Sequence, residues 1–217
     1  MVNLLDAFDL FIFDLDGTLV DSHLQIEKAL NQARIDLNLP TTPKNHVWEN
    51  LGKPVTALLS DLMIEENLQI ALIEIFRKHL GTLISKNNVS YPFASNLLHF
   101  LLQEDKKVAL ATGKSTSMAR AVIDNSDLKG LFNHVQGTDN FEHKPNPTVI
   151  NLCLKEFPGM RSVMIGDRQE DILAARNAGI PSVGISQSAD SPEVLKSYGA
   201  EQVFNNIQCL YFSLLKP

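Results

Sequence analysis

Six polar side chains of this sequence stand where a phosphoryl group could be bound and transferred. Each of them ends or follows a short apolar segment that is typical of a buried strand: Asp14, Asp16, Thr112, Lys144, Asp167 and Asp171. Carboxylates gathered in a partly dry site repel each other unless a hard divalent cation lies between them, and oxygen ligands of this kind suit Mg²⁺. A cation, an ammonium and a hydroxyl would together hold a phosphoryl group, whose transfer depends mainly on positioning and charge neutralisation.

The two carboxylates after the first apolar segment suit the two tasks of such a reaction. Asp14 can attack phosphorus and form an aspartyl-phosphate that water then hydrolyses, which splits one difficult step into two. Asp16, two residues further on, can protonate the leaving oxygen and then deprotonate the attacking water.

Alternating strands and helices must position these groups. The strand-like segments are 9–14, 108–112, a weaker one at 134–137, 163–167, 182–185 and a short final one near 202–204. The helical patterns that alternate with them cover 115–125, 147–157 and 171–178, and a last helix precedes the final strand. This alternation predicts the α/β class, with a parallel sheet covered on both faces. The carboxyl ends of its strands, where ligands bind in such sheets, are the ends that carry the polar groups.

A helical insertion separates the first strand from the rest of the sheet. Ser22 can cap a helix that ends before Pro40, a second long helix is expected over 69–84, and a shorter one over 55–63. We therefore predict a core domain formed by residues 1–17 and 91–217, and an inserted α-helical cap domain formed by residues 18–90.

Composition restricts the kind of partner. The 217 residues carry a net charge of −6 without a basic stripe, which argues against nucleic acid. No apolar run approaches the ~20 residues that span a bilayer, and no Lys or Arg precedes Lys28, so the charged start of a secretory signal is missing. We expect a cytoplasmic protein without a membrane partner. Cys153 and Cys209 stand alone and are expected to fill space only.

The motifs resemble those of the haloacid dehalogenase superfamily of phosphatases. Residues 14–21 (Asp-Leu-Asp-Gly-Thr-Leu-Val-Asp) resemble the first motif, Thr112 the second, residues 144–147 the third, and residues 166–179 the fourth. The insertion after the first strand is similar to the C1-type cap of the phosphoglycolate phosphatase-like and phosphoglucomutase-like branch. The resemblance covers essentially the whole chain and implies a Rossmann-like, three-layer α/β/α core that uses Mg²⁺ to hydrolyse a small phosphorylated metabolite.

The resemblance also implies roles for individual residues. Asp14 would be the nucleophile and a metal ligand, and Asp16 the general acid and base, with its backbone carbonyl on Mg²⁺. Thr112 and Lys144 would bind the transferring phosphoryl group. Asp167 would be the main additional metal ligand, and Asp171 would support it, although a carboxylate at a helix start is also favoured by the helix dipole.

Two positions depart from the family pattern, and two lysines need separate mention. Many relatives carry Asn where this chain has Gly113, which would offer a backbone amide to the phosphate, and Ser or Thr where it has Arg168. Arg168 would pair with a carboxylate, reach a substrate anion, or stay exposed at a helix start. Lys53, in the turn 51–54 of the cap, is a candidate for recognising a second anion, whereas Lys114 is expected to be solvated or to begin a helix.

Several alternatives stay open from the sequence alone. Phosphoglycolate, a sugar phosphate or a nucleotide could be the substrate, and the protein could be a monomer or a homodimer. A phosphomutase of the same fold would return the phosphoryl group to a second hydroxyl instead of to water. The non-enzymatic alternatives are a receiver-like signalling module, against which Asp16 and the long insertion argue, and a binding module whose phosphatase site has decayed.

Overall fold

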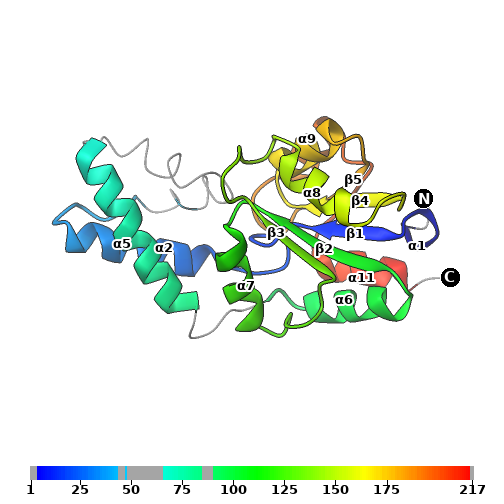
Figure 1. Cartoon of the computed structure of the whole chain (residues 1–217), viewed down its shortest axis with the longest axis horizontal. Coiled ribbons are helices and arrows are strands. Elements are labelled where there is room, and N and C mark those ends of the chain that lie inside the picture. Colours follow the sequence, from blue (N-terminus) through cyan, green and yellow to red (C-terminus); the bar gives the residue numbers. More distant parts are fainter. Residues whose placement is uncertain (1–3, 44–46, 48–65, 85–89, 216–217) are drawn as a thin grey trace.

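The chain forms a central parallel sheet with helices on both faces (Figure 1). The computed structural model describes residues 4–43, 47, 66–84 and 90–215. Its strands are β1 (Leu10–Phe13), β2 (Lys107–Thr112), β3 (His134–Gly137), β4 (Ser162–Gly166), β5 (Ser182–Ile185) and β6 (Gln202–Phe204). Its helices are α1 (Leu4–Ala7), α2 (His23–Asp36), α5 (Glu66–Ile84), α6 (Ala94–Gln103), α7 (Thr116–Asp124), α8 (Thr148–Glu156), α9 (Gln169–Asn177), α10 (Pro192–Ser197) and α11 (Ile207–Leu214).

The sheet has a topological switch point at β1. Its strands follow the order β3-β2-β1-β4-β5-β6, and all neighbouring strands are parallel. The chain therefore builds outward from β1 first to one side and then to the other. A crevice opens outside the carboxyl ends of the strands at such a point, which is where open α/β sheets bind ligands.

Alternate residues of β1 serve the two faces of the sheet. Phe11 and Phe13 belong to a hydrophobic cluster with buried residues of α6, α7 and α11, whereas Leu10 and Ile12 belong to a second cluster with residues of α8 and α9. In Figure 1, α8 and α9 accordingly lie on one side of the sheet, and α6 and α11 on the other. Because both faces are covered, all four residues are fully buried, as a central parallel strand requires.

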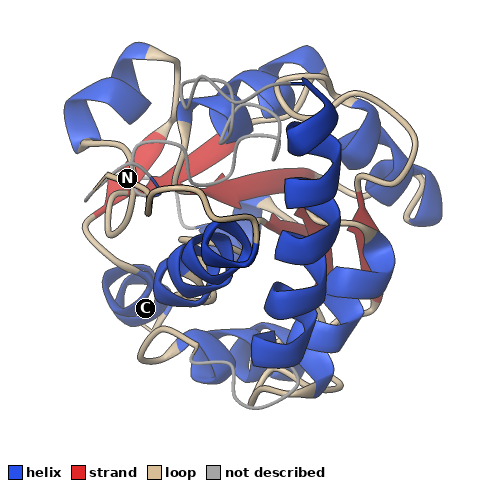
Figure 2. Ribbon diagram, turned by 90° about the vertical axis from the view of Figure 1, so that its left-hand side faces the viewer, coloured by secondary structure: helices blue, strands red, loops and turns tan. Residues whose placement is uncertain are grey.

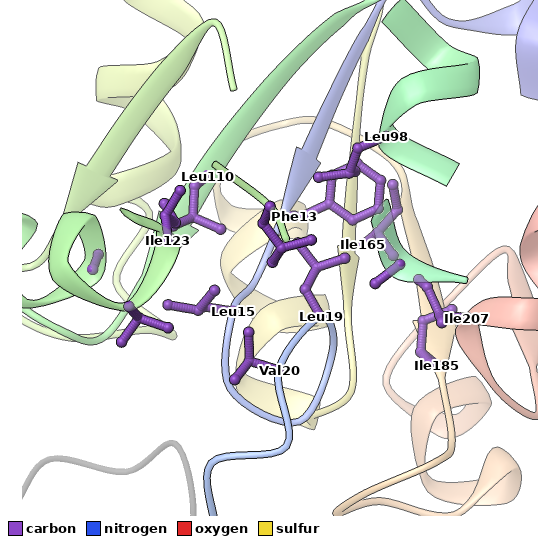
Figure 3. Close-up of a cluster of buried hydrophobic side chains, with 14 of the residues drawn as sticks. Phe13, Leu15, Leu19, Val20, Leu98, Leu110, Ile123, Ile165, Ile185 and Ile207 are labelled. Carbon is purple, nitrogen blue, oxygen red and sulfur yellow. The ribbon is translucent and has the colours of Figure 1, made fainter. Parts of the chain in front are cut away.

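The turn that follows β1 is itself part of the core. Leu15, Leu19 and Val20 lie close to Phe13 in the larger cluster (Figure 3). The amides of Leu19 and Val20 both donate to the carbonyl of Leu15 at 2.9 Å, and the amide of Tyr91 donates to the carbonyl of Leu19 at 2.9 Å. The segment that leaves the sheet region, around Leu19, thus lies beside the segment that returns to it, around Tyr91. The backbone of residues 14–17 is held at the carboxyl end of β1.

Two long helices, α2 and α5, lie beyond the carboxyl ends of the strands and pack against each other. They stand to the left of the sheet in Figure 1 and in front of it in Figure 2. Both helices contribute buried residues to the larger hydrophobic cluster: Leu30 and Ala33 from α2, and Leu72 and Phe76 from α5. The two long helices predicted for the insertion are therefore confirmed.

The predicted strands and most of the predicted helices agree with the structure to within a few residues. The expectation that Ser22 caps α2 with its side chain is wrong, since its hydroxyl donates instead to the carboxylate of Asp16. Helices α1, α6 and α11 were not expected from the sequence. The helix expected over 55–63 lies outside the described residues. None of the helices built from described residues combines the length and the apolar character that a bilayer crossing requires.

Candidate active site

The site begins where β1 and β4 end side by side. The amide of Asp14 donates to the carbonyl of Ile165 at 2.9 Å, which continues the pairing of the two strands one residue beyond β1. Asp167 follows β4 directly, and Asp171 lies in the first turn of α9. As a result, Asp14, Asp167 and Asp171 each have a carboxylate oxygen within 4.8 Å of the others, and all three residues are buried.

Lys144 joins this cluster from the loop before α8. Its Nζ donates to Oδ1 of Asp14 at 2.6 Å, to Oδ1 of Asp171 at 2.5 Å and to the carbonyl of Ala111, at the end of β2, at 3.1 Å. Burial favours the neutral amine, but the two carboxylates raise the pKa of Lys144 above its ordinary value. The side chain is therefore a fixed ammonium whose three N–H groups are all used.

Asp167 offers the oxygen that has the fewest partners. The residue is fully buried, Oδ1 accepts a hydrogen bond from the Thr18 hydroxyl at 2.9 Å, and Oδ2 has no hydrogen-bond partner among the described residues. Burial, and then the charges of Asp171 and Asp14, raise the pKa of Asp167 well above its ordinary value. A buried carboxylate oxygen without a donor is costly unless a proton or a cation satisfies it.

Gly17 lets the chain pass directly over Asp167. Its φ is 85°, in the left-handed region, and a Cβ built on it would collide with the Asp167 carboxylate and with the Ser188 hydroxyl. Glycine is the residue that meets both requirements, because it has no Cβ and adopts positive φ readily. The glycine of the first motif thus brings the turn after β1 into contact with the carboxylate that follows β4.

Asp171 combines a structural and an electrostatic contact. Its Oδ2 accepts the backbone N–H of Arg168 at 3.1 Å as part of a capping box at the start of α9, while its Oδ1 contacts Lys144. A Cβ at Gly166 would collide with this side chain, so β4 must end in glycine for α9 to lie so close. Asp171 therefore lies in the first turn of α9, where the helix dipole favours a carboxylate, and it also contacts the lysine of the site.

Asp14 is the most central of the carboxylates. Burial raises the pKa of Asp14 to about 7; the charge of Lys144 opposes this rise, and the charges of Asp171 and Asp16 add to it. Because the charged form of Asp14 is so unfavourable in the site without a metal, a nearby cation would stabilise that charged form strongly.

Asp16 points to a different set of partners. Its Oδ1 accepts from the Ser22 hydroxyl, and its Oδ2 accepts from the ammonium of Lys114. The side chain of Lys114 is only 11% exposed, so the expectation that Lys114 is solvated is wrong. Asp16 is thus held by one residue at the start of α2 and by another in the loop after β2, 98 positions away in sequence.

Thr112 and Gly113 lie at the end of β2, beside the carbonyl that Lys144 contacts. Thr112 is 1% exposed, and its hydroxyl oxygen accepts the backbone N–H of Lys114 at 3.3 Å. Gly113 lies in the bend that leads from β2 to α7. The end of β2 therefore meets the ends of β1 and β4 as the sequence predicts.

Arg168 pairs with a carboxylate in the first turn of α9. It is buried rather than exposed, and its Nε donates to Oε2 of Glu170 at 3.1 Å. Although burial acts in the opposite direction, the charge of Arg168 and the hydrogen bonds at Glu170 hold the pKa of Glu170 below its ordinary value. Of the possibilities given for Arg168, pairing with a carboxylate is thus the one observed. Lys53 lies outside the described residues.

Three further residues of the site were given no part in it by the sequence: Thr18, Ser22 and Lys114. Thr18 lies within the first motif, so its position was a usable signal, but its partner Asp167 is 149 residues away. The hydroxyl of Ser22 looked like a helix cap, and Lys114 looked like a loop residue. The contacts of Thr18 and Lys114 depend on the packing of segments far apart in the sequence, and the contact of Ser22 depends on the turn that follows β1.

Comparison with known proteins agrees with this geometry. The model of the family described as haloacid dehalogenase-like hydrolase matches residues 11–185. A phosphoglycolate phosphatase from Aquifex aeolicus is 31% identical over 77% of this chain and 80% of its own length, and one from Colwellia psychrerythraea is 29% identical over 95% and 96%. The crystal structure of a predicted phosphoglycolate phosphatase from Haemophilus somnus is 25% identical, with a TM-score of 0.82 over 92% of this chain and 95% of that one. The chain belongs to the haloacid dehalogenase-like hydrolase family.

Proposed function

We propose that this hydrolase is a Mg²⁺-dependent phosphomonoesterase that releases phosphate from a small phosphorylated metabolite of the phosphoglycolate type, through an aspartyl-phosphate on Asp14. The observation that carries the proposal is the buried cluster of Asp14, Asp167 and Asp171 around Lys144, with Asp16 two residues beyond Asp14. The names of the relatives support the substrate class.

The donor set fits Mg²⁺. Three buried carboxylates with only one ammonium among them are short of positive charge, and Oδ2 of Asp167 is buried without a donor. Hard oxygen ligands of this kind are those that Mg²⁺ prefers. Asp14, Asp167 and the backbone carbonyl of Asp16 would hold the ion, with Asp171 in support. When bound there, Mg²⁺ supplies the positive charge that lets the carboxylates and the phosphoryl oxygens approach one another.

The first step is transfer of the phosphoryl group to the enzyme. A carboxylate oxygen of Asp14 forms a bond to phosphorus as the bond from phosphorus to the ester oxygen breaks. Asp16, in its protonated form, gives its proton to the departing oxygen, so that the product leaves as an alcohol. Lys144 keeps Asp14 in position and adds positive charge, and Thr112 with the amide of Gly113 would bind the phosphoryl oxygens.

The second step returns the enzyme to its starting state. Water attacks phosphorus, its proton goes to the Asp16 carboxylate, and the bond between phosphorus and the Asp14 oxygen breaks to release inorganic phosphate. Asp14 is then a free carboxylate and Asp16 is protonated again. We further propose that residues 18–90, including α2 and α5, form a cap over this site and exclude bulk water from it.

The test is phosphate release from phosphoglycolate and from p-nitrophenyl phosphate, with Mg²⁺ or with a chelator. Asp14→Asn should reduce kcat by at least 10³-fold, on the order of the loss that follows removal of a nucleophile. Asp9→Asn is the matched control, because Asp9 lies at the opposite end of β1 and pairs with Arg161 on the surface. Activity retained in Asp14→Asn would contradict the mechanism. Isomerisation of a sugar phosphate without phosphate release would instead identify a phosphomutase.

A further inference from the structure

Lys114 is an ammonium of the site to which the proposed reaction gives no task. Its Nζ pairs with the Asp16 carboxylate, and its side chain is 11% exposed. Lys144 uses all three of its N–H groups, on Asp14, Asp171 and the carbonyl of Ala111. Within the part of the chain that the structure describes, Asp16 is the one acceptor of Nζ of Lys114, so this enclosed ammonium retains hydrogen-bonding capacity for a ligand.

The backbone of Lys114 is fixed where β2 and β3 end. Its N–H donates to the Thr112 hydroxyl at 3.3 Å, and its carbonyl accepts the N–H of Thr138 at 2.8 Å. A Cβ at Gly137 would collide with this same carbonyl, so the two loops lie in close contact. The ammonium is thus carried by a rigid turn, which favours a binding function over that of a solvated surface charge.

Asp16, the partner of Lys114, indicates which part of a substrate Lys114 would contact. Asp16 delivers a proton to the oxygen that leaves phosphorus, so a group that contacts Asp16 lies on the leaving-group side of the site. In phosphoglycolate, one carbon separates that oxygen from a carboxylate. An ammonium beside Asp16 therefore lies where the second anionic group of such a substrate would be, and charge-assisted hydrogen bonds to an ammonium are the strong ones.

We propose that Lys114 binds the carboxylate of the substrate, and that it makes the site selective for phosphomonoesters with a second anionic group close to the ester oxygen. The proposal rests on the proposed function and extends it, because it assigns the choice of substrate to a residue of the core rather than to the cap alone. Ser22, the other partner of Asp16, provides the comparison, since a hydroxyl there contacts Asp16 without adding charge.

The experiment compares two esters of nearly equal size. Phosphoglycolate carries a carboxylate where 2-hydroxyethyl phosphate carries a neutral CH₂OH group. The measured quantity is the ratio of their kcat/KM values, in which any general disturbance of Asp16 cancels. Lys114→Met should lower this ratio by about 10- to 100-fold, mainly through KM for phosphoglycolate. Lys114→Arg, which keeps the charge, should lower it less, and Ser22→Ala should reduce both kcat/KM values and leave the ratio within threefold.

Binding without turnover provides a second measurement. Titration calorimetry should give tighter binding of 3-phosphonopropionate than of propylphosphonate to the wild-type protein with Mg²⁺, and this preference should disappear in Lys114→Met. If Lys114→Met does not fold, Lys114→Gln answers the same question with a polar side chain of similar length.

The outcomes separate this proposal from the proposed function. If the wild type hydrolyses p-nitrophenyl phosphate but treats phosphoglycolate and 2-hydroxyethyl phosphate alike, the role of Lys114 is wrong and the phosphatase stands. A ratio in Lys114→Met within threefold of the wild-type ratio overturns the role of Lys114 as well. If no ester of the three is hydrolysed, the phosphatase itself is wrong, whatever the calorimetry gives.

Discussion

Gly17 provides a sharp test of how the site is built, because the structure gives two separate reasons why no other residue fits there. Its φ is 85°, and a Cβ would collide with the carboxylate of Asp167. Gly179, which ends α9, has a similar φ of 76° but has no atom within 4 Å of the position of a Cβ. Gly17→Ala and Gly179→Ala therefore share the backbone strain and differ in the collision.

The expected magnitudes follow from these contacts. Alanine at positive φ costs about 1–2 kcal/mol, so Gly179→Ala should lower the free energy of unfolding by that amount. Gly17→Ala carries the same strain and also displaces Asp167 from its hydrogen bond with Thr18, a buried hydrogen bond whose loss costs about 1–3 kcal/mol. We expect a total loss of about 2–5 kcal/mol for Gly17→Ala.

The assay is unfolding in urea without metal, followed by measurement of the rise in melting temperature on addition of Mg²⁺. Gly17→Ala should lose most of the Mg²⁺-induced rise, because Asp167 is displaced, whereas Gly179→Ala should keep it. Equal losses of stability and equal responses to Mg²⁺ in the two variants would refute the argument that Gly17 is required by the close approach of Asp167.

Three further predictions concern the metal, the thiols and the core. Because burial raises the pKa of Asp14 from 3.8 to about 7, its protonated form stabilises the metal-free protein fully below about pH 4, and this contribution is lost as the pH rises through 7. Mg²⁺ needs the deprotonated form, so the rise in melting temperature that it causes should grow over this interval. At a hundredfold excess of Mg²⁺ over Kd, the gain in the free energy of unfolding should reach about 2.7 kcal/mol. Ellman's reagent at pH 8 should label the exposed Cys209 and leave Cys153 unreacted until the protein is unfolded, because burial raises the pKa of Cys153 to about 12. Phe13→Ala should lower the free energy of unfolding by about 3–5 kcal/mol in a denaturant titration, since Phe13 is fully buried between β1 and the helices of one face.

The sheet could be predicted from the sequence because its strands are buried on both faces and therefore appear as short apolar runs. Strands β1, β2, β4 and β5 are almost entirely buried, and such runs separated by helical patterns favour one topology. Helices α6 and α11 were missed for different reasons. The residue before α6 is Phe93, which has no polar side chain that would mark the start of a helix in the sequence. Helix α11 is so apolar that it lacks a clear polar face.

The site divides in the same way into a predictable and an unpredictable part. Residues at the carboxyl ends of strands are brought together by the topology alone, so Asp14, Lys144 and Asp167 could be grouped without knowing a single contact. Residues whose function depends on a side-chain partner could not be assigned. Ser22 matched the local pattern of a helix cap, and Lys114 that of a loop, until the fold brought both to Asp16.

The balance of charge explains why ion pairs fix side-chain positions more firmly in this buried site than on the protein surface. The carboxylates of Asp14, Asp16, Asp167 and Asp171 are all at least nine-tenths buried. Three of them pair with two ammonium groups, whereas Asp167 has no ammonium partner among the described residues. In so dry a site each ion pair is screened little by solvent, so each lysine restricts its carboxylates to one geometry. Lys144 joins Asp14 to Asp171 and so keeps the proposed nucleophile beside the carboxylates that would hold the metal. Lys114 holds Asp16 apart from that cluster, and in the proposed mechanism this separation would assign attack to Asp14 and proton transfer to Asp16.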